Sequence, residues 1–142
     1  MFSKNEAKLL RQEFWTSFGK SFPREWILYN TNVKGLSFKF YFDTKTAYVA
    51  LCMDMDPAKQ QAYWEQLLSH KTILETDFLP EVQFEKNFEV SEDKILSVAY
   101  VSIDCKVSIH NKNTWRDVME FFNGHMDLFE KFFIDYRDIL ED

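Results

Sequence analysis

Residues 36–42 show the clearest periodicity in the chain, because large apolar side chains occupy every second position. The apolar members are Leu36, Phe38, Phe40 and Phe42, and the residues between them are Ser37, Lys39 and Tyr41. A period of two is typical of a β-strand with one face in the core and the other toward water. The polar turn 43–46 follows, and the apolar run 47–53 predicts a second, more fully buried strand.

Three helices are predicted from apolar stripes and their capping residues. Ser3 and Glu6 form a capping-box pattern and Gly19 suits a helix end, so we expect a helix over 4–18 with Ala7, Leu10, Phe14 and Phe18 on its buried face. Asp56 and Pro57 are typical of a second helix start, and Trp64, Leu67, Leu68, Leu74 and Phe78 line its predicted inner face. A long third helix is predicted from about Thr114 to Leu140.

The remaining apolar segments predict the rest of the sheet. Residues 26–29 suggest a short first strand, residues 82–90 a strand with a bulge, and residues 95–105 a last strand that runs on toward Ile109. We therefore expect one α+β domain over 1–142, with a mainly antiparallel sheet of four or five strands. Three main helices pack on it in the order α-β(β)β-α-β-β-α.

Charge is divided unevenly along this chain of net charge −6. Residues 1–46 contain eight Lys and Arg against four Asp and Glu, whereas residues 47–142 contain nine against nineteen. Because an acidic body repels phosphate backbones, nucleic-acid binding is disfavoured unless the N-terminal region acts alone. No run of apolar residues is long enough for a membrane span, and the first six residues have no apolar core of a secretory signal. We therefore expect a cytoplasmic protein.

The last predicted helix has two apolar stripes. The dominant stripe contains Trp115, Phe122, Phe129 and Phe133, and a second stripe beside it contains Phe121, Leu128, Phe132 and Ile139. If the second stripe does not reach the sheet, it forms an interface for a homodimer or another protein partner. The alternative is a helix buried on two sides, against the sheet and the first helix.

One flank of the first predicted helix is basic. Lys4, Lys8, Arg11 and Trp15 share it at helical spacing. Basic side chains beside an aromatic ring suit an anion or a nucleic acid, although three charges on one helix are more often a solvated face.

The predicted element order, helix–three strands–helix–strand, prompts a test for a nuclease-like metal site. That chemistry needs clustered carboxylates and a lysine close to an acid on the third strand. Glu6, Glu13 and Asp43 are candidate acids, but residues 47–53 contain neither an acid nor a lysine. The triplets Asp104-Cys105-Lys106 and Glu92-Asp93-Lys94 have the spacing, yet the first comes late in the chain and the second falls in a turn.

Other chemistry is not indicated by the sequence. His70, His110 and His125 are scattered without zinc-ligand spacing, and Cys52 and Cys105 form no CxxC pair. We expect both cysteines to be buried thiols. We assign no catalytic residue, no metal ligand and no cofactor from the sequence.

The opening residues and a later motif together resemble a known family. Ser3-Lys4-x-Glu6-Ala7, followed by Phe14-Trp15-x-x-Phe18-Gly19, is similar to the start of the bacterial "domain of unknown function 4268", often met in Bacteroidetes. Val107-Ser108-Ile109-x-Asn111-x-x-x-Trp115 matches its later pattern. The resemblance implies a link to nuclease-like, nucleic-acid-associated systems and brings no characterised activity. From the residues we predict a non-catalytic binding or assembly module, with a nuclease-like or nucleic-acid-associated accessory domain as the alternative.

Overall fold

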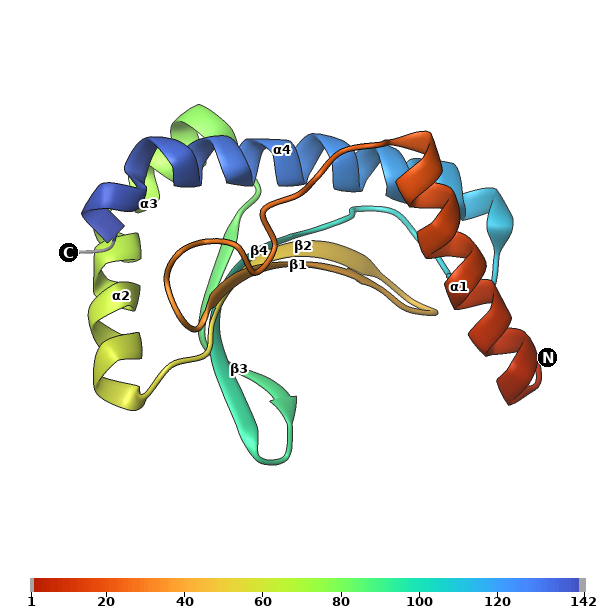
Figure 1. Cartoon of the computed structure of the whole chain (residues 1–142), viewed down its shortest axis with the longest axis horizontal. Helices are drawn as coiled ribbons and strands as arrows, with labels where there is room; N and C mark the ends of the chain where they lie inside the picture. Colours follow the sequence, from red (N-terminus) through yellow and green to blue (C-terminus); the bar gives the residue numbers. More distant parts are fainter. Residues whose placement is uncertain (1, 141–142) are drawn as a thin grey trace.

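The computed structural model of the chain describes residues 2–140, with side chains through residue 138. Its strands form one antiparallel sheet in the order β1-β2-β4-β3. The long helix α4 lies across one face of this sheet, α1 and α2 stand at its two ends, and the whole has the shape of an arch (Figure 1). The predicted α+β class with an antiparallel sheet is therefore confirmed.

The elements follow one another along the chain with these bounds: α1 (Lys4–Ser21), β1 (Leu36–Phe42), β2 (Ala47–Met53), α2 (Pro57–Ser69), α3 (Lys71–Ile73), the π-helical turn η1 (Leu74–Phe78), β3 (Gln83–Ser91), β4 (Lys94–Ser102), the 3-10 turn η2 (Lys112–Thr114) and α4 (Trp115–Leu140).

The predicted helix starts are confirmed at atomic level. The Glu6 N–H donates to the Ser3 hydroxyl at 3.2 Å, and the Ser3 N–H donates back to the Glu6 carboxylate at 3.3 Å. Asp56 caps α2 by accepting from the Lys59 N–H, which satisfies a helix-end donor. The predicted end of α1 at Gly19 is wrong, because the helix continues to Ser21.

The first two strands lie where the alternation over 36–42 and the apolar run over 47–53 predict them. β1 pairs with β2 from Leu36 opposite Met53 to Phe42 opposite Ala47. The bulge predicted in β3 is present as a register shift between Glu85 and Phe88. By contrast, β4 ends at Ser102, earlier than predicted. The chain then wraps around the β1–β2 turn, where the Ile109 N–H donates to the Asp43 carbonyl, so no strand continues through residues 107–109.

Residues 26–29 form a loop and not the predicted first strand. Leu28 has a positive φ of 45°, which is outside the β region. The Phe38 N–H donates to the Leu28 carbonyl at 2.9 Å, so the loop lies along the outer edge of β1. This contact covers an edge that would otherwise be open to another chain.

The second predicted helix is also interrupted. It breaks at His70 into α2, α3 and η1, which changes the direction of the chain. Leu67 and Leu74 remain fully buried as predicted, whereas Leu68 is 38% exposed and does not share their face. A single straight helix would have kept all of these positions on one stripe.

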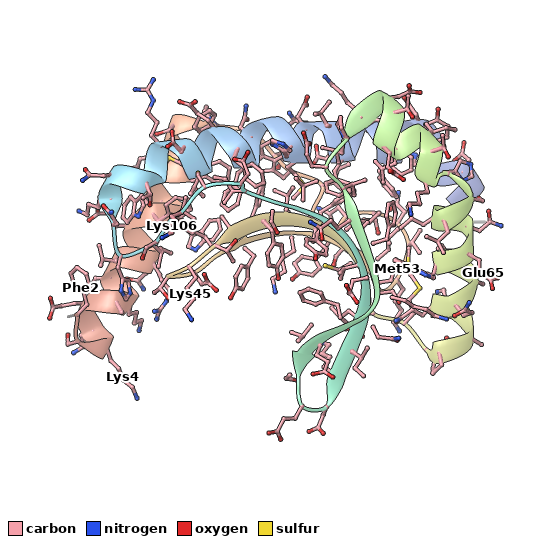
Figure 2. All side chains as sticks on the ribbon, turned by 180° about the vertical axis from the view of Figure 1, so that it is seen from behind. Phe2, Lys4, Lys45, Met53, Glu65 and Lys106 are labelled. Carbon is pink, nitrogen blue, oxygen red and sulfur yellow. The ribbon has the colours of Figure 1, made fainter. Side chains whose placement is uncertain are left out.

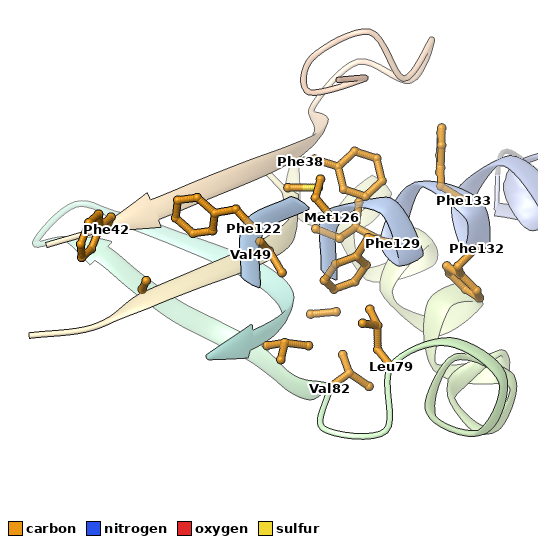
Figure 3. Close-up of a cluster of buried hydrophobic side chains, with 14 of the residues drawn as sticks. Phe38, Phe42, Val49, Leu79, Val82, Phe122, Met126, Phe129, Phe132 and Phe133 are labelled. Atoms are coloured by element: carbon orange, nitrogen blue, oxygen red, sulfur yellow. The ribbon is translucent and has the colours of Figure 1, made fainter. Parts of the chain in front are cut away.

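The main core lies between the sheet and α4. Phe122 is fully buried and its ring contacts the rings of Phe18, Phe40 and Phe42. Phe38 packs against Phe133 with ring centroids 5.5 Å apart. Figure 3 shows Phe38 and Phe42 on β1 together with Phe122 and Phe129 on α4 in this core. Aromatic pairs at such distances stabilise a core beyond the burial of their area.

The loop 22–35 is joined to α4 by salt bridges and a hydrogen bond. The buried carboxylate of Glu130 accepts from the Ile27 N–H at 2.6 Å and from the Arg24 guanidinium at 2.8 Å. Arg24 also donates to Asp127 at 2.6 Å. Burial alone would raise the pKa of Asp127, but the hydrogen bonds from Arg24 and Lys131 outweigh burial and lower that pKa. The loop 22–35 is therefore tied to α4 by charge-assisted bonds.

Candidate functional site

The sheet has one covered face and one open face. Side chains of β1 and β2 alternate, so that Phe38, Phe42 and Val49 point toward α4 while Lys39 and Tyr48 point away. The face away from α4 is the concave side of the arch (Figure 1). In Figure 2 side chains project from this face into the hollow between α1 and the β3–β4 hairpin. We call this surface the open face.

Apolar and aromatic side chains gather on the open face. Ala50, Cys52 and Val98 are almost completely buried there, although no helix of the described chain lies over this face. Rings and aliphatic groups from three strands bury them and leave a shallow pit, lined by Lys39, Tyr48, Ala50, Cys52, Phe88, Val90, Leu96, Val98 and Tyr100. The open face therefore contains a second, smaller apolar cluster, separate from the main core.

The rings of this cluster contact one another across the strands. Tyr41 and Tyr48 lie directly opposite in the register and stack with centroids 4.5 Å apart and an angle of 10°. Tyr48 also contacts Phe88 at 6.2 Å and Tyr100 at 5.9 Å. Cross-strand aromatic pairs stabilise a sheet, so the cluster is prearranged without a ligand.

Burial keeps two acidic groups of the cluster neutral. It raises the pKa of the Tyr48 hydroxyl to about 12 and the pKa of the Cys52 thiol to about 11. A nucleophilic cysteine needs a lowered pKa, because the thiolate is the reactive form. Cys52 therefore has the character of an apolar packing residue.

Tyr41 is held at the edge of the cluster by a carboxylate. Its hydroxyl donates to Asp43 at 2.6 Å, a hydrogen bond that, together with burial, raises the pKa of Tyr41. Burial alone would raise the pKa of Asp43, but the bonds from Tyr41 and from the N–H groups of Lys45 and Thr46 outweigh it and lower that pKa. Asp43 is thus a turn-capping residue with its oxygens occupied.

The two ends of the open face differ in charge. Lys45, in the β1–β2 turn, and Lys106, after β4, lie at the end next to α1, as does Lys4 (Figure 2). The opposite end is the β3–β4 hairpin, whose residues 83–94 contain four carboxylates and two lysines. One of these lysines, Lys94, is paired with Asp54 at 2.9 Å. The surface thus has a basic end, an apolar middle and an acidic hairpin.

The predicted anion-binding residues lie on the exposed flank of α1. Lys4, Lys8 and Arg11 are exposed, and none of them is in an ion pair among the residues that the structure describes. Trp15 is 36% exposed, but its ring stacks on Phe122 at 5.8 Å and an angle of 6°. One face of the indole is therefore used in packing. Anion binding by this flank stays a prediction.

The residues of the predicted partner interface differ in exposure. Phe132 is fully buried against Phe78 and Tyr136, with centroid distances of 5.6 Å and 5.2 Å. Phe121 and Leu128 are half-buried. The side chain of Ile139 lies outside the described part. Phe132 is inaccessible to a partner here because the chain turn at η1 covers it, so a partner interface on this stripe stays a prediction that depends on the other three residues.

Each acid considered for a nuclease site is engaged separately, in a hydrogen bond or an ion pair. Glu6 closes the α1 cap, Glu13 pairs with Lys112, and Asp43 caps the β1–β2 turn. Because residues 26–29 are not a strand, 47–53 form the second strand and not the third. Among the described residues there is no group of three or more His, Cys, Asp or Glu side chains arranged to hold a metal ion.

Histidines and cysteines are placed singly. His110 contacts the ring of Phe2, His125 lies against Phe121, and His70 lies near Tyr136. Both cysteines are free thiols. Cys52 is buried as expected, but Cys105 is exposed, because β4 ends before it and the chain enters a loop. The prediction that both thiols are buried is thus wrong for Cys105.

The open face itself was missed by reasoning from the sequence. Tyr48 and Tyr100 lie in mainly apolar segments, and Phe88 falls in one apolar set with Phe84 and Val90, so a periodicity argument assigns all three aromatic residues to one core. The tyrosine hydroxyls in these strands could have indicated a second, accessible face, because the polar end of a tyrosine needs a hydrogen-bond partner or access to water. Tyr41, Tyr48 and Tyr100 fall on neighbouring strands at positions that share one face.

Comparison with known proteins gives a family and no characterised relative. The search of curated proteins found no match to the chain, and the search of solved structures likewise found none. The profile of one family, described as Domain of unknown function (DUF4268), matches residues 10–137, which include the open face and all four helices in whole or in large part. This match, over most of the chain, shows that the protein belongs to the DUF4268 family.

Proposed function

We propose that this protein is a non-catalytic binding module and that the open face is its binding surface for another protein. The single observation behind this proposal is the preformed aromatic cluster on a sheet face that α4 does not cover. Partly exposed Tyr48, Phe88 and Tyr100 surround buried Ala50 and Cys52. Clustered exposed apolar groups with a polar rim are typical of protein interfaces, where aromatic residues are enriched.

A protein partner suits this surface better than a nucleic acid does. Tyr41 and Tyr48 already stack on each other, and Tyr100 packs against Tyr48 at an angle, so fewer ring faces are free for bases. The hairpin at one end is acidic and would repel phosphates, whereas a protein can supply charges of both signs. The partner we propose has an apolar centre, an acidic region opposite Lys45 and Lys106, and a basic region opposite the hairpin.

The catalytic alternative has less support from the described residues. A nuclease-like role would need carboxylates brought together around a metal, and Glu6, Glu13 and Asp43 are engaged separately. A nucleic-acid-associated accessory role would use the basic flank of α1, and it remains the second proposal. Neither role depends on the open face.

The proposed compartment is the cytoplasm, where free thiols such as Cys52 and Cys105 stay reduced. In the part of the chain that the structure describes, every helix is too short or too polar to cross a membrane.

Site-specific photocrosslinking in the native host tests the proposal. A photoreactive residue at Leu96 on the open face should form a specific adduct, whereas one at Ile134, 53% exposed on α4, should form none. The adduct's partner is then purified and titrated against the wild type, Tyr100→Lys and the matched control Tyr29→Lys, since Tyr29 is 82% exposed elsewhere.

Tyr100→Lys should weaken binding at least about tenfold, because loss of a central aromatic hot spot of an interface typically costs about 2 kcal/mol or more. Tyr29→Lys should leave the affinity unchanged. Equal labelling from Leu96 and Ile134, or a partner that binds Tyr100→Lys as tightly as the wild type, contradicts the open face as the binding surface.

A further inference from the structure

We infer that the partner of the open face is a second copy of this chain, related by a twofold axis that places the hairpin of each copy in the hollow of the other. The inference rests on the proposed function and names its partner. The shape of the arch, the charges at its two ends and the area of the sheet support a second copy as that partner.

Two concave open faces can make close contact only if a part of each copy projects into the other. The open face is concave, so two such faces pressed flat together would leave a void between them (Figure 1). The β3–β4 hairpin projects from the arch on its concave side, as both views show (Figures 1 and 2). Consider two copies with their open faces toward each other and a twofold axis between them, perpendicular to the strands. This axis reverses the strand direction of one copy relative to the other, so the hairpin end of one copy faces the α1 end of its partner. Each hairpin then enters the other copy's hollow near α1.

Charge complementarity selects this orientation. The hairpin tip contains Glu92 and Asp93, both exposed and neither in an ion pair among the described residues. The α1 end contains Lys45 and Lys106, which are exposed and belong to none of the ion pairs of the described residues, although Lys45 also attracts the neighbouring Asp43 carboxylate. Asp104, the acid nearest to Lys106 in sequence, lines a different cavity with Phe121 and His125. The end-for-end arrangement brings acids over lysines at both ends, and the parallel arrangement would bring like charges together.

The apolar part of the hairpin also suits this arrangement. Val90 is 46% exposed on the side of the pit, next to Phe88 and Leu96. Insertion of the hairpin would cover Val90 and the outer surface of Tyr48 in the facing copy. An isologous contact of this kind uses the same patch twice, so each copy both gives and receives a hairpin.

The area of the face predicts a weak dimer. Strands of about seven residues at about 3.3 Å per residue, with four strands about 4.8 Å apart, make a face of roughly 440 Å². Stable interfaces bury about 800 Å² per partner, so the sheet alone supplies about half of that area. The inserted hairpin and the α1 end must supply the rest. We therefore expect a reversible dimer with a dissociation constant in the micromolar range.

Sedimentation velocity of the purified full chain tests the inference. Over about 5 to about 500 μM, the weight-average mass should rise from 17.1 kDa toward twice that value. Two charge-reversed variants are then compared, Lys45→Glu/Lys106→Glu and Glu92→Lys/Asp93→Lys. Each variant should dimerise at least about tenfold more weakly than the wild type, because both of its ends meet like charges.

Mixing the two variants is the decisive measurement. In a mixed twofold dimer the acidic end of one variant meets the basic tip of the other, and the two unchanged ends also remain complementary. The mixture should therefore dimerise within about threefold of the wild type. Lys20→Glu/Lys59→Glu, which makes the same change of charge at exposed positions away from the open face, is the matched control and should dimerise as the wild type does.

The outcomes separate this inference from the proposed function. A protein that stays monomeric over the whole range, or a dimer that mixing of the variants does not restore, overturns the inference. If the chain is monomeric while Leu96 still crosslinks to a different protein, the open face remains a binding surface with another partner. If the chain is monomeric and Leu96 forms no specific adduct, both proposals fall.

Discussion

The two faces of the sheet contain aromatic side chains in very different surroundings. On the covered face, Phe38 and Phe42 lie under α4 with at most 7% of their surface exposed. On the open face, Tyr41, Tyr48 and Tyr100 are half-buried against one another. Phenylalanine dominates where no water reaches, and tyrosine dominates where a hydroxyl can reach water or a nearby acceptor. Aromatic side chains thus form a closed core on the covered face and an accessible cluster on the open face.

This difference separates stability from binding. Rings that α4 covers contribute through complete burial and dense packing, which is worth several kcal/mol per residue in free energy of unfolding. Rings on the open face have surface left to bury, so a partner gains from covering them. Three measurements follow, and the first compares the two faces directly.

The largest difference is expected between Phe122→Ala and Phe88→Ala. Phe122 is fully buried and contacts rings from α1 and β1, so its removal should lower the free energy of unfolding by about 3–5 kcal/mol. Phe88 is half-buried, and its loss should cost about 1–2 kcal/mol because water can fill the space.

Urea denaturation of both variants and the wild type provides these values. Equal losses for Phe122→Ala and Phe88→Ala would mean that the open-face cluster is part of the stabilising core, which would contradict the distinction between the faces.

The second difference concerns the two thiols. With a pKa of about 11, only about one in a thousand Cys52 thiols is ionised at pH 8. Cys52 is also 6% exposed, whereas Cys105 is exposed in a loop. We therefore expect a disulfide reagent to label Cys105 at least about a hundredfold faster, because both burial and protonation protect Cys52.

The Cys105→Ser variant isolates the slow reaction, and urea-unfolded protein serves as the control in which both thiols react quickly. Slower labelling of Cys52 at higher protein concentration would sharpen the comparison, since it would show that association covers the open face. Fast labelling of Cys52 in the folded protein would contradict its assignment as a buried packing residue.

The smallest difference is expected from the salt bridges that hold the loop 22–35 to α4. The pKa of Asp127 is lowered in the folded protein, so its carboxylate stabilises the fold at pH values above the unfolded pKa of about 4. That stabilisation is lost as the pH falls through the folded pKa. Because the Asp127 side chain is 25% exposed and Arg24 is 37% exposed, the effect should stay below about 1 kcal/mol.

Unfolding free energies at pH 7 and at pH 3 measure this effect in the wild type, in Asp127→Asn and in the exposed control Asp135→Asn. The loss of stability on acidification should be smaller in Asp127→Asn than in the other two proteins. An identical pH dependence in all three would show that the Arg24–Asp127 bridge contributes nothing measurable.

Short-range patterns in the sequence determined the first two strands and the starts of the first two helices. The alternation over 36–42, the buried run over 47–53 and the capping residues Ser3 and Asp56 each specify a local conformation, and each is found where it was predicted. The α+β class follows from the order of those elements. Such patterns are local, because the periods of helices and strands depend only on backbone geometry.

Only the tertiary structure decided which sheet face is covered, where the second helix breaks and where β4 ends. The break at His70 places η1 against Phe132, and the wrap of residues 103–109 around the β1–β2 turn exposes Cys105. The open face exists because α4 lies on one side of the sheet and residues 2–140 supply no second layer for the other. These features depend on contacts between residues far apart in the sequence, and no local period encodes them.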